Sequence, residues 1–391
     1  MSLQFIFGNS GSGKSHYLYD YIVKEAVRHP KRNYLVLVPE QFTMQTQKDL
    51  CLAHPRGGIM NIDVLSFARL AHRIFEETGA ENKRILDDEG KNLILRRIAG
   101  KYEPDLKVLK GNLKKQGYIS EVKSVISEFT QYGVGFEVLD SLLDRLDSES
   151  YLYYKLKDIR RVYEGFEQYL ADKYITKEEL LDVLSSVAAK SEILKDSVIA
   201  LDGFTGFTPV QNRLLGELLK TCSKLLVTVE MDGRENPFVY RHPYQLFGIS
   251  KQMVVSLVET ARKNQVEIAE PVTLYEKPVY RFRENPALGF LESALFRYSK
   301  EQYDGEQEAV SIHAARSPKE EAQFAAETVR SLVRKEGYRY RDVAVICSDM
   351  ETYAAHLEKA FATYDIPCFM DHKKLSLIHI SESAGIQCPF R

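Results

Sequence analysis

Residues 8–15 read Gly8-Asn9-Ser10-Gly11-Ser12-Gly13-Lys14-Ser15, and this stretch decides the fold that we expect around it. The pattern G-x-x-x-x-G-K-[ST] is that of a phosphate-binding loop, whose glycines let backbone N–H groups turn toward phosphate oxygens. The lysine adds a positive charge, and the serine hydroxyl reaches Mg²⁺. We therefore predict that ATP binds through Gly8, Ser10, Gly11, Ser12, Gly13, Lys14 and Ser15.

Both flanks of this loop fit the motif. Leu3–Phe7 is typical of a short buried strand, and His16–His29 carries apolar side chains on one side of a helix. A strand that leads into the loop and a helix that follows it place the phosphate at the positive end of that helix.

Further strands and helices alternate around this unit. Tyr34–Val38 and Ile62–Leu65 are typical of buried strands, and Phe67–Thr78 is typical of a helix. Val198–Leu201 and Leu225–Val229 continue the strands later in the chain. The alternation predicts an α/β fold of the P-loop NTPase class, with a parallel sheet covered by helices on both faces.

Residues from about 85 to 190 lack strong strand candidates and show helical periodicity, which predicts a helical insertion. Asp87 is placed to cap its first helix, and Thr176 with Glu179 makes a capping box for its last. The predicted helices are Gly90–Ala99, Ile119–Gln131, Leu152–Lys173 and Lys177–Ala189. For the basic stretch, a solvated helix face is favoured over a nucleic-acid contact. That stretch comprises Lys101, Lys107, Lys110, Lys114 and Lys115.

The C-terminal part predicts a connection followed by a new α/β unit. Residues 235–308 are rich in proline, aromatic and charged residues and have weak periodicity, as a connection between domains would. Strands are predicted at Val310–His313 and Val343–Ile346, with the helix Lys319–Lys335 between them. The sequence from about residue 375 resembles a translated sequencing adapter, so we expect a non-native tail on an N-terminal fragment.

A phosphate loop needs an acidic partner for Mg²⁺ at the end of a neighbouring buried strand. Asp202 directly follows Val198–Leu201, so Ser15 and Asp202 are the predicted magnesium ligands. The next residue is Gly203, where hydrolysing motors usually carry a glutamate that orients the attacking water. No carboxylate follows before Glu217. The sequence therefore predicts a site that binds Mg·ATP but hydrolyses it poorly, and it assigns no catalytic residue.

Composition is that of an ordinary globular chain, with 44% hydrophobic and 28% charged residues among 391. The net charge of −2 requires any polyanion site to be a local groove. The five cysteines form no C-x-x-C pair and indicate no metal or disulfide framework. The sequence has no signal peptide and no apolar run of ~18 residues, so we expect a cytoplasmic protein without a membrane partner.

Several segments, in this order, resemble superfamily-1 DNA helicases, and more closely the AddB family, the B subunits of bacterial AddAB helicase–nucleases. They are Gly8–Ser15, Val38–Thr43, Leu65–Ala71 and Leu201–Gln211. The last of them is the specific part, because it reads D-G-F-T-G-F-T-P-V-Q where helicases carry D-E-x-Q-D. Later segments resemble the start of the second motor domain, so the resemblance covers about residues 1–373. These are Arg341–Ile346, Tyr353 and Ile366–Asp371.

The resemblance implies a RecA-like domain organisation. Residues 1–85 and 191–300 would form domain 1A with its connection, 86–190 a 1B-like insertion, 301–374 the truncated start of domain 2A, and 375–391 the tail. It implies ATP and Mg²⁺ as cofactors and an AddA-type helicase–nuclease subunit as partner. The implied task is the processing of single- and double-stranded DNA ends in recombinational repair. The nuclease and iron–sulfur cysteines of that family lie far C-terminal, so neither is expected in this chain.

DNA contacts in that family lie on the loops after the second and third strands. Gln41 and Thr43 offer hydrogen bonds there, Phe67 a stacking face, and Arg69 a phosphate or base-edge donor. Each also has an ordinary explanation, because Phe67 fits a core position and Arg69 a solvated helix.

Two other classes of function fit parts of the sequence. A nucleotide or small-molecule kinase would share the phosphate loop, although the helical insertion and second α/β unit argue against one. A structural subunit with a vestigial nucleotide site is the other alternative, and intact Lys14, Ser15 and Asp202 argue for retained binding.

Overall fold

The computed structural model describes residues 1–79, 84–112, 115–171, 174–176 and 178–370. The predicted non-native tail lies outside these residues, as do Lys114, Lys173 and Lys177 of the predicted insertion. The described chain forms two compact units, Met1–Gly305 and a second that begins at Glu306.

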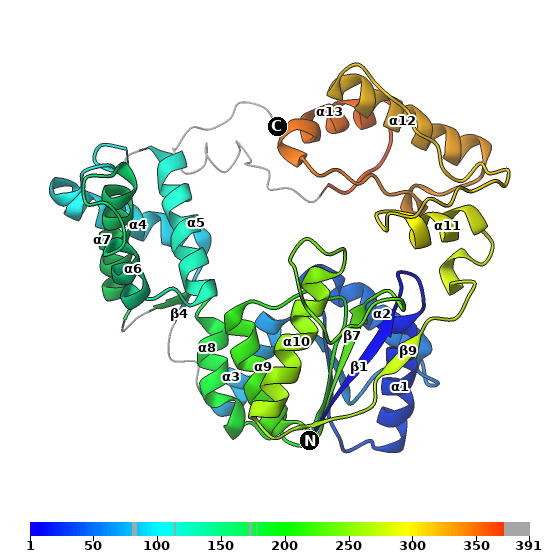
Figure 1. Ribbon diagram of the computed structural model, residues 1–391, viewed down its shortest axis with the longest axis horizontal. Coiled ribbons are helices and arrows are strands. Elements are labelled where there is room, and N and C mark those ends of the chain that lie inside the picture. The colour runs from blue at the N-terminus through cyan, green and yellow to red at the C-terminus, as the bar shows by residue number, and fades with distance from the viewer. Residues whose placement is uncertain (80–83, 113–114, 172–173, 177, 371–391) are drawn as a thin grey trace, which may run out of the picture. The chain divides into compact units, whose positions relative to one another are not determined.

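A parallel sheet forms the centre of the first unit (Figure 1). Its strands, within the described residues, are β1 (Ser2–Gly8), β2 (Tyr34–Leu37), β3 (Ile62–Leu65), β6 (Val198–Leu201), β7 (Lys224–Glu230), β8 (Glu267–Ile268) and β9 (Val272–Leu274). The order is β3-β2-β6-β7-β1-β8, with β9 also beside β1, and every pair is parallel. The five strands that the sequence predicted here and the α/β class are confirmed.

Helices cover both faces of this sheet. Successive strand residues point to opposite sides, so the apolar strands present hydrophobic side chains on both faces, and each face packs against helices. On β2, Tyr34 and Val36 pack toward α1 (Lys14–Arg28) and α2 (Thr43–Ala53). Leu35 and Leu37 face the opposite core, built from four other helices. These are α3 (Phe67–Thr78), α8 (Leu180–Val187), α9 (Pro209–Thr221) and α10 (Gly248–Lys263). Short 3₁₀ turns, η1 (Glu40–Phe42) and η3 (Ala188–Lys190), adjoin α2 and α8.

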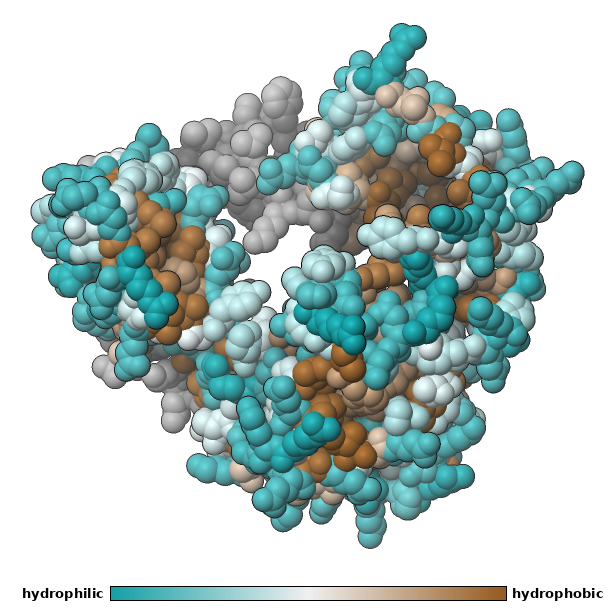
Figure 2. All heavy atoms as spheres, viewed as in Figure 1, coloured by the Kyte–Doolittle hydropathy of each residue, from teal (hydrophilic) through white to brown (hydrophobic). Residues whose placement is uncertain are grey.

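The predicted helical insertion forms a separate layer with its own core, except for its last predicted helix, which corresponds to α8 and packs in the core of the sheet. Its helices are α4 (Asp88–Tyr102), η2 (Glu103–Asp105), α5 (Gln116–Tyr132), α6 (Phe136–Leu143) and α7 (Tyr151–Leu170). Figure 2 shows hydrophobic residues gathered on the visible face of this layer. Asp87 accepts a hydrogen bond from the Gly90 N–H at 2.7 Å, which confirms the predicted cap. The reciprocal Thr176–Glu179 pair is also present.

Two short strands in this layer were not predicted. β4 (Arg84–Leu86) pairs in parallel with β5 (Tyr174–Thr176). Three residues give no periodic signal in the sequence, and the pairing joins segments about ninety residues apart, which local patterns do not reveal.

The prediction that residues 235–308 are only a connection is wrong. This region contains α10, β8, β9, η4 (Tyr280–Phe282) and α11 (Pro286–Ala294), and as far as Gly305 it belongs to the first unit. On α10 the buried residues Val254, Leu257 and Ala261 contact the sheet core. The short segments β8 and β9 form strands because both pair in parallel with the same edge of β1.

The second unit contains α12 (Pro318–Lys335), η5 (Tyr340–Asp342) and α13 (Met350–Thr363), and the predicted helix 319–335 is confirmed. Residues of α12 and α13 form a small core around Ala326 and Phe361. The strands predicted at Val310–His313 and Val343–Ile346 are not formed in the described residues 306–370. A strand needs a hydrogen-bonded neighbour, and no described strand of this unit offers one.

Candidate functional site: a glycine-rich loop and its acidic partner

The glycine-rich loop connects β1 to α1 at the carboxyl edge of the sheet. Gly11 and Gly13 have positive φ angles of 75° and 92°, which glycine adopts without steric cost. The Ser12 N–H donates to the Asn9 carbonyl at 3.2 Å and closes a turn within the loop. The backbone therefore folds tightly around the N-terminus of α1, where an anion is favoured.

Lys14 lies folded back on this loop. Its Nζ donates to the carbonyl oxygens of Gly8 at 3.1 Å and Asn9 at 2.8 Å. Burial lowers the pKa of Lys14, while the nearby carboxylates of Glu230 and Asp202 oppose that shift. A partly desolvated ammonium group is stabilised by an added anion, so a phosphate at this position would be favourable.

Asp202 follows β6 and is buried, with 5% of its surface exposed. The Ser15 hydroxyl donates to Oδ1 at 3.0 Å, and the Thr228 hydroxyl donates to the same oxygen at 2.6 Å. The Tyr19 hydroxyl donates to Oδ2 at 2.7 Å. Burial and then Asp202 raise the pKa of Tyr19, so this hydroxyl keeps its proton. Ser15 and Asp202, the predicted magnesium ligands, are thus in contact, and their oxygen atoms suit a hard cation.

Sequence reasoning missed Tyr19 and Thr228 as partners of Asp202. Tyr19 lies one helical turn after Ser15, so helical spacing could have found it once the loop was known. Thr228 lies on β7 beside β6, and only the strand order brings it to Asp202.

Gly203 follows Asp202 with a positive φ of 77°. Glycine therefore suits this backbone conformation, and the position offers no carboxylate for hydrolysis. Glu230, at the end of β7, exerts the strongest charge attraction on Lys14. It is an acidic residue near the loop that the sequence did not single out.

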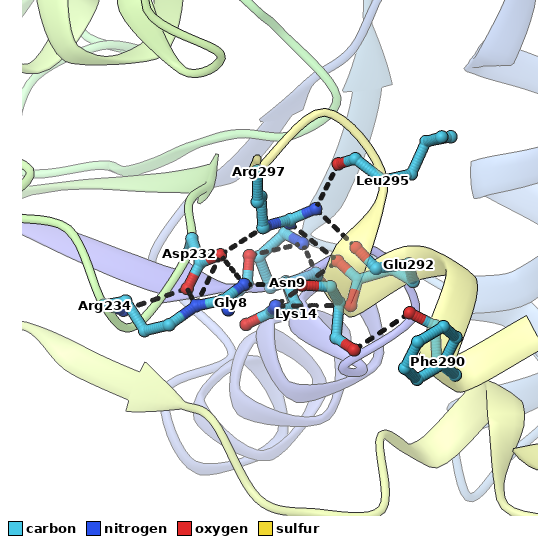
Figure 3. Close-up of polar contacts among 10 residues, drawn as sticks. Gly8, Asn9, Lys14, Asp232, Arg234, Phe290, Glu292, Leu295 and Arg297 are labelled. Carbon is cyan, nitrogen blue, oxygen red and sulfur yellow. Dashed lines mark hydrogen bonds and ion pairs between the residues drawn. The ribbon is translucent and has the colours of Figure 1, made fainter. Parts of the chain in front are cut away.

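A second polar cluster lies beside the loop (Figure 3). Asp232, just after β7, accepts from the guanidinium groups of Arg234 and Arg297, each at 2.6 Å. These arginines hold the pKa of Asp232 far below its usual range, with Arg234 the larger cause. Arg297 also contacts Glu292 at 3.4 Å, and Asn9 Nδ2 lies 3.3 Å from the same carboxylate. Local sequence patterns gave no signal for this cluster.

The four predicted DNA-contacting residues lie at the same edge of the sheet, after β2 and β3. Gln41 and Arg69 are exposed. Thr43 is buried, and its hydroxyl donates to the Glu40 carbonyl at 3.0 Å. Phe67 is 8% exposed and packs against Phe204 and Phe207, with ring centroids 5.4 and 6.3 Å away.

Comparison with known proteins places this chain in a family. Residues 5–292 match the family model described as ADDB, N-terminal. The chain belongs to the AddB N-terminal family. Proteins named as the B subunit of an ATP-dependent helicase/deoxyribonuclease are similar to it over nearly its whole length. That of Lachnoclostridium phytofermentans is 43% identical over 96% of this chain, and that of Clostridium kluyveri 34% identical over 97%.

This AddB-family chain spans about a third of the length of these relatives, since the matches cover 33% of each. A third relative, from Desulforudis audaxviator, is 36% identical over 96% of the chain and is covered to 32%. Among the described residues, no helix has the length and apolar character that crossing a membrane requires.

Proposed function

We propose that this AddB-family chain binds Mg·ATP and DNA as part of the B subunit of a helicase–nuclease. The subunit would work with an AddA-type partner on broken DNA ends during recombinational repair. The names of the relatives support the helicase–nuclease setting. The proposal for nucleotide binding rests on one observation, the gathering of Lys14, Ser15 and Asp202 at one end of the sheet, with Ser15 and Asp202 in contact at 3.0 Å.

In the proposed complex, Lys14 would leave its carbonyl partners and bind the terminal phosphates. Ser15 and Asp202 would hold Mg²⁺, which neutralises phosphate charge when bound. Tyr19 and Thr228 would fix the carboxylate of Asp202 by their hydrogen bonds. Such partners of a metal ligand orient it and exclude other conformations.

Nucleotide titration with Lys14→Ala tests this proposal. Loss of a charged donor to phosphate should weaken Mg·ATP binding by roughly 10- to 100-fold, equivalent to about 1.5–3 kcal/mol. Lys24→Ala is the matched control, because Lys24 lies on the same helix and pairs with Asp20 at the surface. Equal affinities of wild type and Lys14→Ala would refute the assignment. Absence of binding in the wild type would favour a structural subunit with a vestigial site.

Slow hydrolysis is part of the proposal, because Gly203 offers no base. Loss of a general base commonly reduces the rate by ~10²–10⁴. Single-turnover measurements on the full-length protein with its partner should therefore give slow hydrolysis. Rapid turnover that Glu230→Gln abolishes would instead identify Glu230 as the base.

For DNA binding, we propose the surface at the loops after β2 and β3, without direct contacts from the predicted residues Thr43 and Phe67, which are buried. Gln41 and Arg69 are exposed and can contact DNA directly. Phe42, 49% exposed in the same turn as Gln41, presents more of its ring than the buried Phe67 does. Phe42→Ala should then weaken single-strand binding by ~1–3 kcal/mol if a base stacks there. Unchanged affinity in a Phe42→Ala/Arg69→Ala variant would exclude this surface.

A further inference from the structure

The segment from Tyr280 to Arg297 lies against the glycine-rich loop. The Arg281 N–H donates to the Gly11 carbonyl at 3.1 Å. A Cβ atom at Gly11 would come within 2.7 Å of the Arg281 Cβ, so the two backbones approach as closely as glycine allows. Ser10 of the loop and Leu288 and Leu291 of α11 line one cavity of about 510 Å³. This segment therefore contacts the loop at Gly11 and Ser10.

Glu292, on α11, brings a carboxylate to the loop itself. Its Oε1 and Oε2 lie 3.3 and 3.4 Å from Asn9 Nδ2, as Figure 3 shows beside Lys14. The charge of Glu292 also acts on Lys14, raising the pKa that burial lowers. The Glu292 carboxylate is thus an anion near a lysine and an amide donor. Such donors are the groups with which the loop would bind a phosphate oxygen.

Two arginines hold Glu292 in this position. Arg297 donates to the Glu292 carbonyl at 2.5 Å and to its carboxylate at 3.4 Å, while it also contacts Asp232. Arg234, the second arginine on Asp232, donates to the Ser293 carbonyl at 2.8 Å. The side chains of Arg297 and Glu292 are each 13% exposed. The C-terminal end of α11 is thus linked through the two arginines to Asp232.

We propose that Glu292 is an autoinhibitory contact, whose carboxylate must leave Asn9 when ATP enters the loop. The proposal rests on the proposed nucleotide binding and adds a regulatory step to it. Bound triphosphate carries several negative charges, and a carboxylate held beside the loop in a partly buried site would be repelled by them. Nucleotide binding would therefore release the end of α11, and residues 295–305 that follow it, from the loop.

Titration with a fluorescent ATP analogue and Mg²⁺ on the full-length protein tests this contact. Glu292→Gln keeps the size of the side chain and one acceptor oxygen and removes its charge, so it should bind the analogue about tenfold more tightly than wild type. Glu284→Gln is the matched control, since Glu284 is an exposed glutamate shortly before α11. It should leave the affinity unchanged.

The outcomes separate this proposal from the proposed function. Wild-type binding that Lys14→Ala weakens and Glu292→Gln leaves unchanged, or also weakens, would overturn the autoinhibitory contact and keep the nucleotide site. Absence of binding in wild type and in Glu292→Gln would overturn both.

Hydrogen exchange gives a second readout that does not depend on affinity. In wild type, the amides of residues 286–297 should exchange faster after Mg·ATP is added. In Glu292→Gln they should exchange faster already without nucleotide, at an unchanged melting temperature of the whole protein. Exchange that neither the nucleotide nor the substitution alters would overturn the proposal.

Discussion

Asp202 accepts hydrogen bonds from three hydroxyl groups, those of Ser15, Tyr19 and Thr228. Two of them come from α1 and one from β7, so the carboxylate is fixed from two elements. A buried carboxylate without such donors would be costly, and here its charge is satisfied by contacts that also set its orientation. At the scale of single residues, the site depends on geometry as much as on residue type.

Substitutions at Gly11 and Gly13 separate the cost of backbone strain from the cost of a steric clash. Both have positive φ angles, but only Gly11 has a neighbour that a Cβ would strike. Gly13→Ala should lower the free energy of unfolding by about 1–2 kcal/mol through backbone strain alone. Gly11→Ala should cost more, because Arg281 must also move. Chemical denaturation of the two variants would compare them, and equal losses would contradict the role of the Arg281 contact.

Glu167, on α7, makes stability depend on pH. Burial raises its pKa from 4.5 to about 7, and the neighbouring Glu179 adds to the shift. Since the folded state holds this proton more tightly, its stabilising contribution is complete below pH 4.5 and is lost as pH rises toward 7. We expect Glu167→Gln to raise the melting temperature at pH 8 and to change it little at pH 4.5. Glu128→Gln, at an exposed position of α5, should show no such difference between the two pH values.

At the scale of elements, one carboxylate fixes a loop of the helical layer. Asp158 of α7 is 4% exposed and accepts hydrogen bonds from the backbone N–H groups of Lys107, Val108 and Leu109. These donors follow η2, where the chain leaves α4. The backbone groups of a buried loop must find partners, and here one side chain supplies them.

Asp158→Asn should therefore destabilise the helical layer. An amide can accept with one oxygen only, and its NH₂ group would face backbone donors, which costs about 1–3 kcal/mol. Denaturant unfolding would measure the loss, and faster hydrogen exchange confined to residues 103–111 would locate it. Asp144→Asn, at an exposed position after α6, serves as control. If both variants were equally stable, the proposed anchoring by Asp158 would be wrong.

At the scale of the whole molecule, the chain divides into units with separate hydrophobic cores. The hydrophobic cores of the first unit consist of residues from the sheet, its covering helices and the helical layer. The core of the second unit consists of residues from α12, α13 and the segment that follows. Every residue of the candidate nucleotide site lies before Gly305. The site is thus assembled by one unit.

A chain shortened to end at Gly305 should therefore fold and keep its affinity for Mg·ATP. Comparing the melting curve and nucleotide titration of the shortened chain with those of the full chain tests this. Loss of binding on shortening, in a chain that still melts cooperatively, would mean that the second unit contributes to the site.

Local patterns in the sequence were enough to define the loop, its flanking strand and helix, and the strands β2, β3, β6 and β7. Each of these elements carries its own signal: an apolar run that ends at a turn, or a helical stripe with its cap. For the same reason Ser15, at the start of the helix after β1, could be paired with Asp202, which directly follows the parallel strand β6.

Which other residues join them depends on the tertiary arrangement. Glu292 reaches Asn9 across 283 positions of the chain, and Thr228 reaches Asp202 because β7 lies beside β6. Strand formation was settled in the same way, since β8 and β9 pair with β1 whereas Val310–His313 has no strand partner among the described residues. Such contacts depend on which elements become neighbours, and hydrophobic burial over the whole fold, rather than any local pattern, sets that arrangement.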